Sequence, residues 1–150
     1  MIFRKINYFG LFLITLSLIG CASTKQYVPV PNQNVRVEDE NKARIYVIRP
    51  ASSFGAAIPM AIIDNGLLIG DTGAASYLSW ERDPGDVSIS GKSENTSKVE
   101  FTAKKGDVYY IEQFINMGFA IARNRLELID EEKGKKLQAA CKPPKYVPRN

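Results

Sequence analysis

The sequence predicts a mainly β protein: a small antiparallel β-sandwich with a short C-terminal helix, preceded by a signal peptide and a flexible tether. Two observations carry this prediction. From residue 43 onward, short runs rich in β-branched and aromatic residues alternate with Gly, Pro, Asn and Asp, which is typical of an all-β sandwich or barrel. Near the N-terminus, residues 8–19 form one apolar run without a charged side chain, which is typical of an export segment.

The composition is that of one globular domain. The chain has 150 residues, of which 45% are hydrophobic and 24% are charged, so a buried core is expected. The formal net charge is +4, but Arg4 and Lys5 lie in the predicted leader. The other basic residues are interleaved with acidic ones, a pattern that mainly favours solubility. We therefore expect no nucleic-acid partner.

Residues 1–20 predict a cleaved signal peptide. Arg4 and Lys5 supply the positive charge that the cytoplasmic face of a membrane retains, and the apolar run at 8–19 follows them. This run is shorter than the roughly 20 apolar residues that a transmembrane helix needs. An ordinary secretory signal with a chance cysteine, or an uncleaved anchor, remains the alternative.

The end of the leader resembles the bacterial lipobox. Leu18, Ile19 and Gly20 precede Cys21, and the lipobox consists of an aliphatic residue, two small or aliphatic residues and a cysteine. The resemblance implies cleavage between Gly20 and Cys21. It also implies a diacylglycerol thioether and an N-acyl chain on Cys21, which together form a stable membrane anchor. No other cofactor is expected.

Two further residues bear on location and on the cysteines. Ala22 follows Cys21, where an aspartate resembles the inner-membrane retention signal of Gram-negative bacteria. In a two-membrane cell this favours an outer-membrane protein that faces the periplasm. Cys141 is the second of two cysteines, so a Cys21–Cys141 disulfide is the competing interpretation if Cys21 is not acylated.

The mature chain divides into three regions. Residues 21–42 contain Pro, Asn and Gln without a sustained helical or strand period, so they predict an acylated N-terminus followed by a flexible tether. Residues 43–140 predict the β-sandwich domain, and residues 141–150 a C-terminal tail. Asp130 is placed to cap a short helix that follows it. The expected strands within the domain cover residues 43–49, 60–63, 67–70, 77–80, 86–91, 98–103, 108–114 and 126–128.

The order of these strands and turns resembles the domain of unknown function 2846 family, a set of small bacterial lipoproteins and envelope proteins. The resemblance covers most of residues 43–138 and implies a small β-sandwich behind a lipobox, with no established activity. It rests on residues 43–50 (ARIYVIRP), 63–70 (IDNGLLIG), the Pro84-Gly85 turn, 106–111 (GDVYYI) and 126–132 (LELIDEE).

The sequence lacks the residues of most catalytic sites. It contains 0 His, which removes the usual general base and the commonest metal ligand. We therefore expect neither catalytic residues nor a metal site. A carboxylate-dependent envelope enzyme, such as a glycan hydrolase, is the alternative. Its candidate pairs are Glu81 with Asp83 and Glu131 with Glu132.

Two predicted loops, residues 54–58 and 117–122, are more apolar than loops usually are. Apolar connections can mark a contact with a partner or a membrane, so Phe54 and Phe119 are the candidate contact residues. The alternative is that both rings fold back over the end of the sandwich. The sequence thus favours a non-catalytic binding or scaffolding module with an envelope protein as partner.

Overall fold

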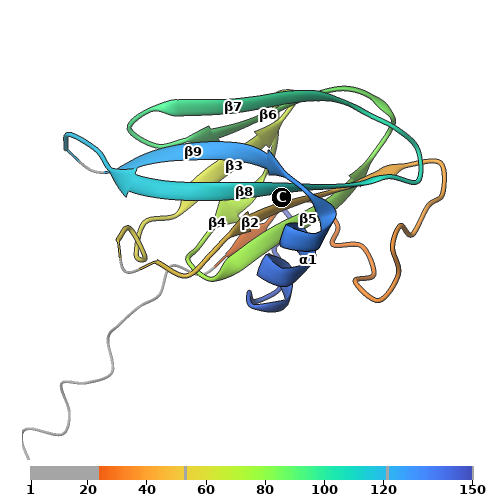
Figure 1. The fold of residues 1–150 in the computed structure, drawn as a ribbon, viewed down its shortest axis with the longest axis horizontal. Helices are drawn as coiled ribbons and strands as arrows, with labels where there is room; N and C mark the ends of the chain where they lie inside the picture. Colours follow the sequence, from red (N-terminus) through yellow and green to blue (C-terminus); the bar gives the residue numbers. More distant parts are fainter. Residues whose placement is uncertain (1–23, 53, 121, 150) are drawn as a thin grey trace, which may run out of the picture.

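The protein folds as two facing β-sheets with one helix, as seen in a computed structural model that describes residues 24–52, 54–120 and 122–149 (Figure 1). The elements are β1 (Lys25–Gln26), β2 (Ala43–Arg49), β3 (Met60–Asp64), β4 (Leu67–Thr72), β5 (Ser76–Arg82), β6 (Gly85–Lys92), β7 (Thr96–Ala103), β8 (Val108–Met117), β9 (Ala122–Ile129), α1 (Glu131–Ala139) and β10 (Lys145–Tyr146). The predicted mainly β, two-sheet fold with a short C-terminal helix is confirmed.

The sheet topology differs from a purely antiparallel sandwich. Strands follow the order β10-β1-β4-β3-β6-β7 in one sheet and β5-β2-β8-β9 in the other. Most neighbours are antiparallel, but β2 pairs with β8, and β1 with β10, in parallel. The chain between β2 and β8 builds most of the other sheet before it returns. Such a long crossover permits a parallel pair, whereas a tight hairpin does not.

The core lies between the two sheets, and β2 is its centre. Ile45, Val47, Ile62, Leu78 and Ile111 are fully buried there. Every residue of β2 is buried, because the other sheet covers one face of the strand and further chain covers the other. This explains why its sequence, ARIYVIR, lacks the alternation of a half-exposed strand.

Helix α1 packs on the outer face of the four-stranded sheet. The rings of Tyr46 and Tyr110 stack there with their centroids 5.1 Å apart. A Cβ at position 134 would overlap the Tyr110 ring, so the glycine that weakens the helix locally allows it to approach the sheet. Asp130 caps the helix as predicted, since its side chain accepts the Lys133 N–H at 2.8 Å.

Residues 24–42 pack against the sheets, and the prediction of a flexible tether is wrong for this part of the chain. Gln26 is fully buried. Its Oε1 accepts the backbone N–H of Ser79 at 2.9 Å, and its Nε2 donates to the Ser79 carbonyl at 2.6 Å. The side-chain amide thus completes the exposed edge of β5, as a neighbouring strand would. Because Gln26 and Ser79 lie far apart in the sequence, their contact produces no local pattern from which it could be predicted.

The C-terminal tail also joins the fold. In β10, Lys145 and Tyr146 pair with Lys25 and Gln26, and the Val147 amide donates to the Gln26 carbonyl at 2.8 Å. Strand β1 therefore lies between β4 and β10, and the two ends of the domain stabilise each other.

The strand directions define two ends of the sandwich, and we call the one where β1 begins the β1 end. Strands β2, β4, β6 and β8 finish there, and β3, β5, β7 and β9 start there. Hydrogen bonds between the two sheets show that these strand ends lie at the same end of the sandwich. One of them joins Arg49 Nη1 to the Thr72 carbonyl at 2.9 Å. The opposite end, or far end, carries the β3–β4 turn and residues 28–42 (orange, right side of Figure 1).

Gln26→Ala should lower the free energy of unfolding by about 2–6 kcal/mol, because each of the two backbone groups left unpaired at Ser79 costs roughly 1–3 kcal/mol when buried. Lys25→Ala is the matched control. It lies in the same strand with an exposed side chain and should change stability by no more than about 0.5 kcal/mol. Urea unfolding measures both, and equal midpoints would show that residues 24–42 do not support the fold.

Candidate functional site

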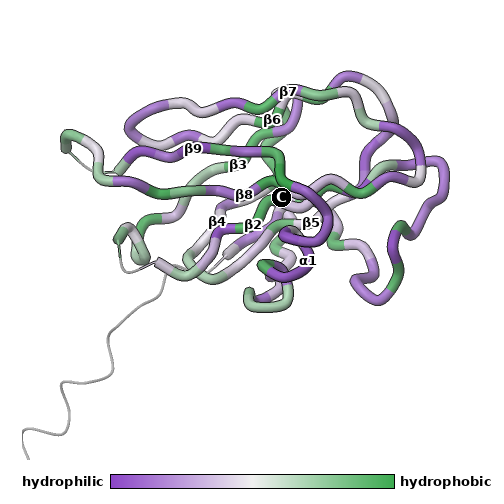
Figure 2. The backbone as a smooth tube through the Cα atoms, viewed as in Figure 1, coloured by the Kyte–Doolittle hydropathy of each residue, from purple (hydrophilic) through white to green (hydrophobic). Residues whose placement is uncertain are grey.

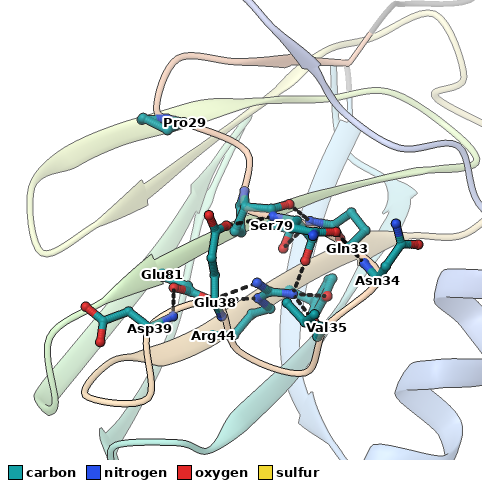
Figure 3. Close-up of polar contacts among 12 residues, drawn as sticks. Pro29, Gln33, Asn34, Val35, Glu38, Asp39, Arg44, Ser79 and Glu81 are labelled. Carbon is teal, nitrogen blue, oxygen red and sulfur yellow. Dashed lines mark hydrogen bonds and ion pairs between the residues drawn. The ribbon is translucent and has the colours of Figure 1, made fainter.

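A buried arginine fixes residues 29–39 on the outer face of the four-stranded sheet (Figure 3). Arg44 is fully buried. Its Nη1 donates to the carbonyls of Asn32 and Val35 at 2.9 and 2.7 Å, and its Nη2 lies 2.7 Å from Glu81 Oε1. Because a buried charge is costly unless it is paired and hydrogen-bonded, these contacts fix the position of the loop.

Glu81 is committed to the same cluster. Its Oε1 accepts the backbone N–H of Glu38 at 2.5 Å and its Oε2 that of Asp39 at 3.1 Å, in addition to the contact with Arg44. Asp83, the other member of the pair predicted for the enzyme alternative, lies exposed in the β5–β6 turn. Glu81 therefore serves as an acceptor that holds the loop.

A groove of about 390 Å³ opens at the far end, between the N-terminal segment and the β3–β4 hairpin. Its size falls in the range of small-ligand sites. One wall is formed by residues 28–31, and Leu67 and Ile69 stand on the hairpin side. The remaining lining residues are Glu38, Lys42, Asp64, Trp80, Glu81 and Arg82.

Fixed polar groups lie behind the apolar walls of this groove. Asp64 is buried, accepts the Trp80 Nε1–H at 2.8 Å and forms an ion pair with Arg82. The indole is thereby satisfied and held in one orientation. Of the three groove carboxylates, Asp64 and Glu81 are paired with arginines, and Glu38 accepts the Asn32 N–H at 2.8 Å. The arrangement therefore suits binding of an apolar group better than proton transfer.

A second concavity, of about 280 Å³, lies between residues 33–36 and helix α1. Arg36, one of its lining residues, forms an ion pair with Glu131, with Arg36 Nη1 2.6 Å from Glu131 Oε1. The hydrogen bond from Arg36, followed by that from Lys135, lowers the pKa of Glu131 to about 2. Burial raises the pKa of Tyr110 to about 12, so its hydroxyl stays neutral. Glu131 is thus a structural carboxylate and too acidic for a general acid at neutral pH.

The candidate residues identified from the sequence lie in different parts of the molecule. Gly20 and Cys21 lie outside the described residues. Phe54 is half-buried in the loop after β2, which Arg49 ties down by donating to the Gly55 carbonyl at 2.5 Å. Phe119 is fully exposed in the turn after β8. Both phenylalanines belong to the β1 end, away from the groove.

Cys141 is half-buried, and burial raises the pKa of its thiol. Its Sγ lies 3.8 Å from the Arg49 carbonyl. In the part of the chain that the structure describes, no three or more Cys, Asp or Glu side chains gather as metal ligands would. No helix among the described residues is long and apolar enough to cross a membrane.

These observations define a small two-sheet β-sandwich module with a groove at one end. The chain belongs to the DUF2846 family, described as a protein of unknown function, which it matches over residues 39–124. The stretch at 126–132 that contributed to the resemblance lies beyond the match. No curated protein and no solved structure matches the chain.

Several residues that build the site were not recognised from the sequence. Arg44 lies inside a strand whose next four residues, 45–48, are apolar or aromatic, and a charge in that position is the available signal for a buried ion pair. Trp80 and Asp64 come from different hairpins, so their contact could not be inferred from spacing. Gln26 gave no signal, because it stands in a segment without a strand pattern.

Arg36→Ala should raise the pKa of Glu131 from about 2 toward its ordinary value of 4.5, with only Lys135 left to oppose the shift. Because the folded-state pKa is depressed, the ion pair stabilises the protein above about pH 4.5, and that contribution is lost as the pH falls toward 2. Carbon-13 NMR titration of the side-chain carboxyl measures the shift. The control is Arg125→Ala, which removes the partner of Glu127 instead; equal Glu131 titrations in both variants would refute the assignment.

Proposed function

We propose that the protein is a lipid-anchored module of the bacterial envelope that binds a partner and catalyses no reaction. In this proposal the leader is cleaved between Gly20 and Cys21, and the acylated Cys21 holds the domain on the membrane. The observation that carries the proposal is the order of the N-terminal features, in which positive charge, an apolar run and a lipobox follow one another. Ala22 favours delivery to the outer membrane, facing the periplasm, in a two-membrane cell.

Cleavage at this position is compatible with the fold. Strand β1 begins at Lys25, so a chain that starts at Cys21 keeps every described element. The chain meets the sandwich at Thr24, whose Oγ1 accepts the Gly73 N–H at 3.0 Å.

The groove at the far end supports a binding role. Its apolar walls suit side chains of an envelope protein, and Leu67 remains 60% exposed beside it. An exposed leucine next to a concave apolar surface is typical of a contact site. Phe119 and Phe54 supply a second surface at the β1 end. No feature of the groove favours the carboxylate-dependent enzyme that the sequence left as an alternative.

Cys21→Ser should abolish incorporation of a fatty-acid analogue and leave an unprocessed precursor, because only the thiol accepts the diacylglycerol. Metabolic labelling followed by mass spectrometry of the purified protein measures both effects. Cys141→Ser is the matched control, and we expect it to label like the wild type. Undiminished labelling of Cys21→Ser would refute the anchor.

A photocrosslinking residue at position 67 should capture a discrete envelope protein in intact cells. The control position is Leu128, an equally large apolar residue that is 46% exposed on β9, away from the groove. We expect its adducts to be few and heterogeneous. The same adduct pattern from both positions would refute the groove as the binding surface.

A further inference from the structure

The turn between β8 and β9 exposes apolar side chains at the β1 end. We call Met117, Gly118, Phe119 and Ala120 the β8–β9 tip. Met117 is 77% exposed and Phe119 is fully exposed. Figure 2 shows apolar colouring at this tip and in the loop after β2, both at the left of the molecule. Adjacent exposed apolar side chains at a projecting turn are typical of a contact with another surface.

The tip projects on a long hairpin. The pairing of β8 with β2 ends at Glu112, and β8 continues to Met117 with β9 as its pairing partner in that sheet. These five further residues span about 17 Å at the usual rise of a strand. Figure 1 accordingly places the end of this hairpin at the left extremity of the described fold.

Backbone contacts hold the tip in one conformation. The Glu94 carboxylate accepts the Phe119 N–H at 3.1 Å and the Ala120 N–H at 3.3 Å, and the Glu94 amide donates to the Ala122 carbonyl at 3.2 Å. The turn between β6 and β7 thus braces the turn between β8 and β9. A braced tip loses little conformational freedom on contact, which favours binding.

The same end of the sandwich receives the chain from Cys21. Two residues, Ala22 and Ser23, separate Cys21 from Thr24. The three Cα–Cα steps between them place the acylated residue within about 11 Å of Thr24 even when the chain is fully extended. Thr24 is itself fixed to Gly73 and Ser76. If Cys21 carries the lipid, the β1 end must therefore remain next to the headgroups.

The charge of the β1 end is suited to an anionic surface. Five exposed basic residues lie there: Lys25 at the start of β1, Lys145 beside it at the start of β10, Lys92 at the end of β6, Arg123 near the start of β9, and Lys142 beside Ser76. The acidic residues of this end are Asp71, which pairs across from Lys25 and accepts from Tyr27, and Glu94 at the tip. Basic residues within a Debye length of anionic headgroups are attracted to them.

We propose that Met117 and Phe119 insert into the interfacial layer of the membrane that holds Cys21. The inference rests on the lipid anchor of the proposed function. With two contacts, the lipid and the tip, the domain stands end-on with its groove directed away from the membrane.

The test uses the Phe119→Trp protein in its processed, acylated form, purified and reconstituted in phosphatidylethanolamine and phosphatidylglycerol vesicles whose acyl chains carry bromine. The new indole should be blue-shifted and lose fluorescence relative to plain lipid, because bromine quenches only within contact range. Leu128→Trp is the control and should keep its fluorescence, since Leu128 belongs to the opposite part of β9. The native Trp80 is buried and supplies a constant background.

The outcomes separate the two proposals. Equal quenching ratios for Phe119→Trp and Leu128→Trp in protein that mass spectrometry shows to be acylated would overturn tip insertion and leave the anchor standing. A product without acyl chains would overturn the anchor and, with it, this inference. Both substituted positions are exposed, so neither variant disturbs the core.

Discussion

The packing of residues 24–42 depends on two buried polar side chains, Gln26 and Arg44. Gln26 completes the edge of β5 through hydrogen bonds to the Ser79 backbone. Arg44 donates to two carbonyls of the loop at residues 29–39 and forms an ion pair with Glu81. Because buried polar groups must be paired, the loop cannot leave the sheet without exposing several unsatisfied atoms. The segment held in this way forms one wall of the groove. The same contacts fix the point at which the chain enters the sandwich.

In the lipoprotein that we propose, that entry point links the fold to the membrane. A free segment of about twenty residues would let the domain move some 25 Å from its anchor, whereas a chain fixed from Thr24 leaves a short connection. The ends of the sandwich then acquire different roles. Under this proposal the β1 end, with its basic residues and exposed tip, lies on the side of the anchor, and the groove lies on the other side.

Much of the fold could be predicted from the sequence because it depends on local patterns. The strand at 43–49, the Asn65-Gly66 turn and the Asp130 cap are encoded by residues close together in the chain. The N-terminal segment and the groove were missed because they depend on contacts between distant residues. Gln26 meets Ser79, and Trp80 meets Asp64, only after the sheets have assembled.

Amide hydrogen exchange tests most directly whether the N-terminal segment belongs to the fold. The Tyr27 amide donates to the Ile69 carbonyl, and the Val147 amide to the Gln26 carbonyl, both at 2.8 Å. Our account predicts protection of these amides comparable to that of β2. Exchange at the rate of an unstructured chain would contradict it and restore a freely moving tether.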